Sequence, residues 1–316
     1  MSNLMLKKLL SIVASMFFSA SVWAAQYPEV LNITYVKAPF NIQNMVMKNH
    51  QLLEKEFEKE GIRINWIPIK AGLNQVRGMA AGEIDMVAAM NTTTLMIANS
   101  VGNRIVIVGG VAHPDETFAV VAKPNIAKEI SDLKGKTIVG PKGTVLHHLL
   151  TLALDKSQMK MSDVHFVSMN LPSSLTTLLA GKADAALVAA GGLLKAQEHG
   201  FKTLVSAKGM LSTNLVLAAR GDFADRYPEV VERVAKVNKQ ALVWAQQNRQ
   251  QAVALGAKEH KISEQEANAL YDWSAFYSDL TQKDIQAMKD SQAFLLQEKM
   301  MTQPVVVESL IKTTVH

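Results

Sequence analysis

Three polar segments of the sequence hold residue types that suit the binding of a small ligand. They cover residues 37–41, 89–94 and 140–144, and the last two stand directly before segments with helical periodicity. Backbone N–H groups at the start of a helix carry a partial positive charge and favour an anion. A threonine at such a start either caps the helix with its hydroxyl or contacts a ligand. The candidates in the last two segments are Asn91, Thr92, Gly143 and Thr144.

Patterns typical of catalysis or metal binding are missing from the sequence. His147 and His148 are adjacent, so on a helix they point about 100° apart and cannot chelate one metal ion together. Asp115 and Glu116 would face opposite sides of a strand. The sequence has no cysteine, no H-E-x-x-H motif, no G-x-S-x-G elbow and no glycine-rich nucleotide loop. We therefore expect neither an enzyme nor a bound metal or cofactor.

Length and charge narrow the class of protein further. The chain has 316 residues, of which 48% are hydrophobic and 19% charged, with a formal net charge of +5. This length suits about two domains of ordinary size. Basic and acidic residues are interspersed, without an arginine-rich arm or a basic stripe interleaved with aromatic residues. Nucleic acid is therefore not an expected partner.

The N-terminal segment has the pattern of a secretory signal peptide. Lys7 and Lys8 precede an apolar run over residues 9–22, and small residues follow up to Ala24. This run of about fourteen residues is shorter than the ~20 that a transmembrane helix needs. No cysteine follows that would carry a lipid anchor. We predict residues 1–24 to be removed and the mature protein to be soluble and periplasmic.

The polar segments lie in an alternating pattern of strands and helices, which indicates an α/β fold. The alternation runs over residues 32–108, with one helix predicted over 42–57, and restarts over 130–205. It favours parallel sheets with helices on both faces and a ligand at the carboxyl ends of the strands. A strand at 117–121 need not stay in the first sheet, and one at 214–219 would cross back to it. The remaining tail is helical and should wrap the first lobe.

An internal similarity supports two related lobes. Residues 79–89 and 179–189 both show a helix that ends at Ala-Gly and a strand that begins at an aspartate, Asp85 or Asp184. Coincidence in an alanine-rich chain is the alternative explanation. If the lobes are related, the two helix starts at Asn91–Thr92 and Gly143–Thr144 would face each other across a cleft.

With these segments in order, the sequence resembles the periplasmic binding proteins of ABC importers for nitrate, taurine and aliphatic sulfonates, the NMT1-like group. The motifs that carry the resemblance include A-G-E-I-D at residues 81–85, L-K-G-K-T-I at 133–138 and K-G-T at 142–144. Further matches lie at residues 33–37, 73–76, 181–185, 219–224 and 227–231. The match runs from about residue 30 to about residue 250.

The resemblance implies the type II periplasmic binding protein fold, with two doubly wound lobes joined by a two-strand hinge. Lobe one would hold residues 25–115 and 215–316, and lobe two residues 116–214. The protein would be a monomer that captures a small anionic solute and docks on an ABC permease in the inner membrane. By position, the ligand-binding residues would be Lys37, Ala38, Phe40, Asn91, Thr92, Gly143 and Thr144, with Asn214 near the hinge.

One departure from the family pattern leaves the identity of the ligand undetermined. Many members have an aromatic residue and a proline after the second Ala-Asp strand, whereas this chain continues Ala189-Ala190-Gly191-Gly192. No arginine lies in the candidate loops to clamp a sulfonate or carboxylate with two hydrogen bonds. Two alternatives to transport remain: a pyrimidine-precursor synthase-like enzyme, whose cysteine-rich motif is absent, and a periplasmic ligand-sensing subunit of a signalling system.

Overall fold

The structure is a computed structural model that describes residues 27–69 and 72–313. The predicted signal peptide, residues 1–24, lies outside these ranges. Within them, no helix combines the length and apolar character that crossing a lipid bilayer would require.

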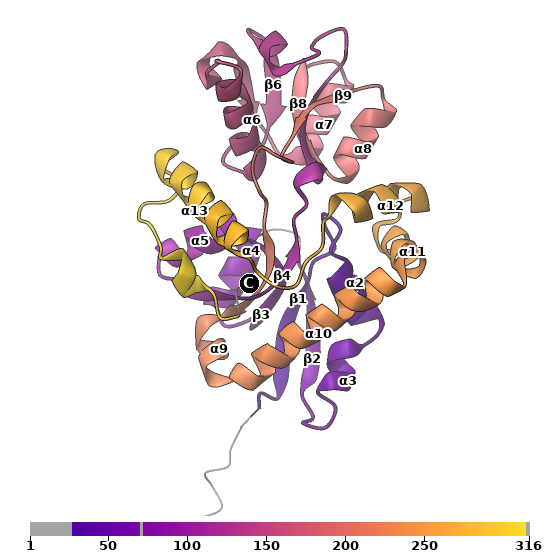
Figure 1. Ribbon diagram of the computed structural model, residues 1–316, viewed down its shortest axis with the longest axis vertical. Helices are drawn as coiled ribbons and strands as arrows, with labels where there is room; N and C mark the ends of the chain where they lie inside the picture. Colours follow the sequence, from indigo (N-terminus) through magenta and orange to yellow (C-terminus); the bar gives the residue numbers. More distant parts are fainter. Residues whose placement is uncertain (1–26, 70–71, 314–316) are drawn as a thin grey trace, which may run out of the picture.

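Two five-stranded sheets form the centres of two lobes, one above the other in Figure 1. We call the part built on the first sheet lobe one and the part built on the second sheet lobe two. The first sheet has the order β2-β1-β3-β10-β4 and the second β7-β6-β8-β5-β9. The strands are β1 (Val30–Tyr35), β2 (Arg63–Pro68), β3 (Met86–Asn91), β4 (Ile105–Ala112), β5 (Phe118–Ala122), β6 (Thr137–Gly140), β7 (His165–Ser168), β8 (Ala185–Ala189), β9 (Lys202–Ser206) and β10 (Leu215–Arg220).

The sheets are parallel, as the alternating pattern favoured, except for one antiparallel strand in each, β10 or β5. β1 runs parallel to β2 and β3, and β6 runs parallel to β7 and β8. β10 is antiparallel to β3 and β4, and β5 is antiparallel to β8 and β9. These two strands are the ones that the chain enters on crossing from the other lobe, as the sequence predicted for both. The two crossings form the two-strand hinge expected from the resemblance.

Helices cover the sheets and make up most of the C-terminal tail. They are α2 (Ile42–Asn49), α3 (Leu52–Glu56), α4 (Gly72–Ala80), α5 (Thr92–Ser100), α6 (Val145–Lys156), α7 (Leu171–Leu179), α8 (Gly191–Glu198), α9 (Gly221–Arg226), α10 (Pro228–Gln247), α11 (Arg249–His260), α12 (Glu264–Trp273) and α13 (Gln282–Gln297). The single helix predicted over residues 42–57 was wrong. It is divided into α2 and α3 because Gln51 adopts a left-handed backbone conformation with φ 54°.

Both faces of each sheet are buried, as the apolar character of the strands requires. In β10, Leu217 packs into one core cluster of lobe one, while Val216 and Ala218 pack into another on the opposite face. In β8, Leu187 packs into one core cluster of lobe two and Val188 into the other, on the opposite face. Helices on both faces of each sheet therefore hold the strand ends in place.

The internal similarity found in the sequence corresponds to one repeated hydrogen-bond arrangement. The Oδ2 atom of Asp85 accepts the backbone N–H of Asn32, within β1, at 2.9 Å. The Oδ2 atom of Asp184 accepts the backbone N–H of Thr137 at 2.8 Å, at the start of β6. In both lobes an aspartate thus fixes the strand that follows the Ala-Gly turn, β3 or β8, against its parallel neighbour, β1 or β6. Asp85 also accepts a hydrogen bond from Arg220 at 3.0 Å.

The helical tail wraps lobe one and also reaches lobe two. α10 and α11 pack against α2 of lobe one. Trp273 of α12 packs against core clusters of both lobes, and Phe294 of α13 stacks on His148 of α6. Figure 1 shows α12 and α13 on opposite sides of the region between the lobes. The tail therefore flanks the junction between the lobes on two sides, which the sequence did not predict.

A test of this packing is the substitution Gly256→Ala in α11. A Cβ at this position would lie 2.1 Å from Cζ of the fully buried Phe40, so the ring would have to shift. Overpacking costs about 1–3 kcal/mol, which exceeds the gain of up to about 1 kcal/mol from better helix propensity. We expect chemical denaturation to show a free energy of unfolding lowered by about 1–2 kcal/mol.

The matched control is Gly191→Ala in α8, where a Cβ would have no atom within 4 Å. This variant should be as stable as the parent or slightly more stable. Equal stability of the Gly256→Ala and Gly191→Ala variants would contradict the packing described for Phe40.

Candidate functional site

A small cavity lies where the two lobes meet, at the ends of strands from both sheets. Its volume is about 10 Å³, which is room for about one water molecule. The residues that line it come from both lobes, the hinge and α13: Asn91, Thr92, Thr93, Gly143, Thr144, Val145, His148, Ser212, Thr213, Asn214, Ser291, Phe294 and Leu295. The structure thus brings together Asn91, Thr92, Gly143, Thr144 and Asn214 of the predicted site.

The start of α6 supplies the donors that lobe two presents to this cavity. Thr144 occupies the N-cap position but makes no side-chain cap, because its hydroxyl donates to the carbonyl oxygen of Pro141 at 3.0 Å. The Gly143 N–H points to Nδ1 of His147 at 3.3 Å. The first N–H groups of a helix have no partner within the helix, so an uncapped start favours an acceptor from outside. The start of α6 therefore lies at the cavity without a side-chain cap.

Gly143 makes the turn that precedes α6 possible. Its φ is 75°, a conformation that residues with a side chain rarely adopt. A Cβ here would also approach Cε of Met300 to 3.2 Å. The loop before α6 is therefore constrained both by its own backbone and by the segment after α13.

The start of α5, on the lobe-one side, is capped. Oδ1 of Asn91 accepts the Thr93 N–H at 2.8 Å, and the Thr92 N–H donates to the carbonyl oxygen of Asn214 at 3.1 Å. Asn91 rather than a threonine is the capping residue. The two helix starts meet at one cavity, but α5 has already given two of its first amide donors to acceptors within the protein.

Asn214 is held in place by the hinge. Its Nδ2 donates to the carbonyl oxygen of Asp284 at 3.3 Å, and its Oδ1 accepts from the Ser212 hydroxyl at 3.2 Å. Oδ1 also lies 3.0 Å from Nδ1 of His113, which belongs to the other crossing segment. A second link joins the crossings, since Asp115 Oδ1 accepts both the N–H and the hydroxyl of Thr213 at 2.7 Å. Asn214 therefore connects the cavity to both strands of the hinge.

Three predicted site residues are not among those that line this cavity. Lys37 donates from Nζ to the backbone carbonyl of Glu259 at 2.8 Å. Ala38 is exposed, and Phe40 has no exposed surface because its ring packs against His260 and Tyr271. Phe40 contributes to the core of lobe one, so in this conformation it offers no surface to a ligand.

His148 and Phe294 are cavity residues that the sequence did not single out for ligand binding. Their rings are stacked at 3.7 Å between centroids and 9° between planes. They lie 146 positions apart, on α6 and α13. Because α13 was expected to cover only lobe one, no sequence pattern placed Phe294 at the site.

The cavity carries little charge. His148 is the one titratable residue among those that line it. Burial, together with the positive charge of His147, lowers the pKa of His148 from its ordinary 6.5 to about 4, so its ring is neutral at pH 7. Among the residues that the structure describes, no three His, Asp or Glu side chains are placed to share a metal ion. What the cavity offers is hydroxyl, amide and imidazole dipoles together with the α6 terminus.

Comparison with known proteins places this geometry in context. The chain is 26% identical to a protein of Escherichia coli (strain K12) named as an aliphatic sulfonates-binding protein, over 75% of this chain and 74% of that one. It is 28% identical to the taurine-binding periplasmic protein of the same strain, over 58% of each. In structure it matches the periplasmic aliphatic sulphonate binding protein SsuA of Escherichia coli with a TM-score of 0.82, 21% identity and coverage of 90% and 92%.

The SsuA match confirms the type II fold predicted from the resemblance. A family model, NMT1/THI5 like, matches residues 56–252, which is more than half of the sequence. The chain therefore belongs to the NMT1/THI5-like family.

Proposed function

We propose that this protein is the solute-binding component of an ABC importer and that it captures a small organic sulfonate between its lobes. The observation that carries the proposal is the uncapped start of α6, which opens onto a cavity lined by residues of both lobes. A sulfonate has three acceptor oxygens and one negative charge, which match free N–H groups and the positive end of a helix dipole. The names of the sulfonate-binding and taurine-binding relatives support the same ligand class.

The neutral lining favours an anion over a cation. The first-turn amides of α6 and the hydroxyls of Thr93 and Ser291 offer hydrogen-bond donors, whereas no carboxylate lines the cavity. The anion accepts hydrogen bonds from these donors, which replace the water molecules that it loses on entry. The absence of an arginine clamp means that position and number of donors, rather than a full opposite charge, determine affinity.

Ligand binding then requires movement of the lobes. A cavity of about 10 Å³ is too small for a sulfonate, so the lobes must part for a ligand to enter and must then close around it less tightly than they do here. A ligand that contacts α6 on one lobe and α5 on the other favours the closed arrangement. The segments that bend would be the two crossings that Asp115 and Thr213 join. Lobe one would comprise residues 25–115 and 215–316 and lobe two residues 116–214.

The proposed function also implies where the protein acts and what it contacts. The signal peptide predicted over residues 1–24 would deliver a monomer to the periplasm, where the closed form docks on an inner-membrane permease. The protein would not be an enzyme. The cavity lining has no carboxylate that would orient His148 as a general base for one of its hydroxyl groups.

The substitution Thr144→Trp tests the location of the ligand. An indole at the α6 start would fill the cavity and cover the first-turn amides. We expect the affinity for ethanesulfonate in isothermal titration calorimetry to fall by about 100-fold or more, equivalent to about 2.7 kcal/mol of binding free energy.

Thr176→Trp is the matched control, because Thr176 is exposed on α7 of the same lobe and does not line the cavity. It should bind ethanesulfonate as the parent does, and both variants should keep the parent circular dichroism spectrum. Parent-like affinity of the Thr144→Trp variant would contradict the proposed site.

The pH dependence of stability tests the burial of His148. Its pKa is about 4 in the folded protein and ordinarily 6.5, so the unfolded chain binds more protons between these values. This contribution to stability is complete above pH 6.5 and is lost as the pH falls towards 4. The substitution His148→Phe keeps an aromatic ring against Phe294 and removes the titration.

We expect the free energy of unfolding to decrease less between pH 7.5 and pH 4.5 in the His148→Phe variant than in the parent. His199→Phe, at an exposed position on the same lobe, is the control and should retain the parent pH dependence. An identical decrease in the His148→Phe variant and the parent would show that His148 is not buried in a neutral form.

A further inference from the structure

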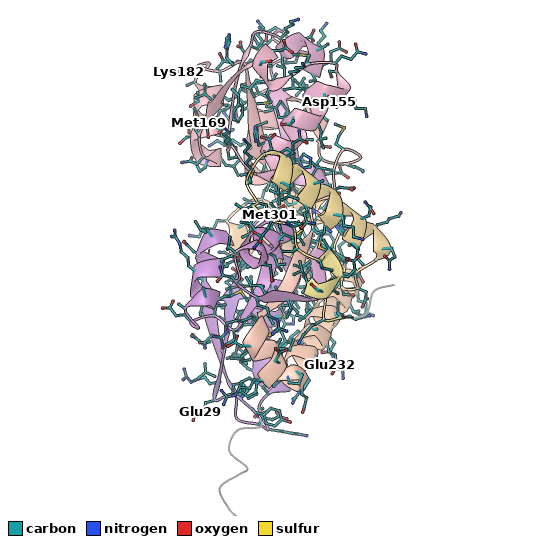
Figure 2. The ribbon with its side chains drawn as sticks, turned by 90° about the vertical axis from the view of Figure 1, so that its left-hand side faces the viewer. Glu29, Asp155, Met169, Lys182, Glu232 and Met301 are labelled. Carbon is teal, nitrogen blue, oxygen red and sulfur yellow. The ribbon has the colours of Figure 1, made fainter. Side chains whose placement is uncertain are left out.

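A larger hollow lies directly beside the cavity. This groove runs between α6, the loop over residues 209–212 and α13, and its volume is about 850 Å³. In the side view of Figure 2, α13 lies below Asp155 of lobe two, which is one of the groove residues. Cavity and groove share four residues, namely His148, Ser212, Ser291 and Phe294. The two spaces are therefore neighbours that differ in volume by nearly two orders of magnitude.

The His148–Phe294 stack is the aromatic part of the boundary that they share. At 3.7 Å between centroids and 9° between planes, the two rings are in face-to-face contact and leave no room for a chain of atoms between them. His147 adds a second ring at 6.5 Å from Phe294, at 69°. A ligand whose head lies at the α6 start can thus pass between these rings into the groove only if they separate.

Both halves of the stack are anchored. On the α6 side, His147 is buried and stacks on Phe166, which fixes the helix turn that carries His148. On the α13 side, Leu295 is buried in a core cluster of lobe one. At the start of α13, the Asp284 side chain caps the helix through Thr281. One ring is therefore anchored to each lobe, and the contact between the rings joins the two lobes beside the cavity.

We propose that the His148–Phe294 stack limits the length of the ligand, so that the closed protein selects sulfonates with short tails. This inference rests on the proposed function, since it concerns the tail of the same bound anion. When a ligand binds with the two rings in contact, the cavity widens at the α6 start and the whole tail must fit there. With the stack removed, the tail extends into the groove past Leu152 and Leu211, which line it together with polar residues.

The substitution Phe294→Ala tests the proposal through the ratio of two affinities. In the parent we expect ethanesulfonate to bind about tenfold or more tightly than hexanesulfonate in isothermal titration calorimetry, because a closed wall excludes the extra methylenes. In the Phe294→Ala variant we expect the two dissociation constants to agree within about threefold, because the cavity opens into the groove.

Two control variants distinguish the effect of removing the Phe294 ring from the effect of a general loss of structure. Phe294→Tyr keeps a ring in the stack and should keep the parent ratio. Leu152→Ala enlarges the groove without changing the two stacked rings, and this variant should also keep the parent ratio of affinities. If Phe294→Ala does not fold, Phe294→Leu replaces it. The ratio of its dissociation constants for hexanesulfonate and ethanesulfonate should be smaller than that of the parent and larger than one.

The outcomes separate the two proposals. Binding of ethanesulfonate by the parent, with the same ratio in the parent and in Phe294→Ala, would overturn the length limit and leave the proposed function standing. Equal affinity of the parent for both sulfonates would also overturn the length limit. A parent that binds neither sulfonate would overturn the proposed function, and with it the inference.

Discussion

The first-turn amides of α6 impose the constraint on which the binding site depends. Thr144 stands where a cap is expected, yet its hydroxyl is bonded to Pro141, so the helix begins without a side-chain acceptor. N–H groups that face a closed cavity need a partner, because an unsatisfied buried donor is costly. An anion supplies acceptors and also interacts favourably with the helix dipole. The lobes, the hinge and the tail helices matter for function because they enclose this terminus.

The two lobes contribute unequally. On α5, Asn91 and the Asn214 carbonyl take the amides of Thr93 and Thr92, so lobe one presents a helix start that is already satisfied. Asn214 is itself fixed by Asp284 and Ser212. Lobe one and the hinge therefore form a fixed wall, and lobe two brings the free donors. The α13 contact to His148 then decides how much space the closed arrangement leaves.

Sequence reasoning reached the order of the elements and the meeting of Asn91–Thr92 with Gly143–Thr144, because alternating periodicity and turn residues are local signals. Strand direction was not predictable, since the apolar patterns of β5 and β10 are the same whichever way the strands run. The burial of Phe40 depends on the missing side chain of Gly256, over two hundred positions away. The His148–Phe294 stack likewise depends on where the tail packs, and neither residue carries a local mark of that contact.

A crystal structure of the protein with bound ethanesulfonate tests the central claim most directly. If the α6 terminus is the anion site, sulfonate oxygens will lie within roughly 2.7–3.2 Å of the backbone nitrogens in the first turn of α6, with both lobes in contact with the ligand. A sulfonate bound elsewhere, for example at Lys37 with the α6 amides turned to solvent, would contradict it.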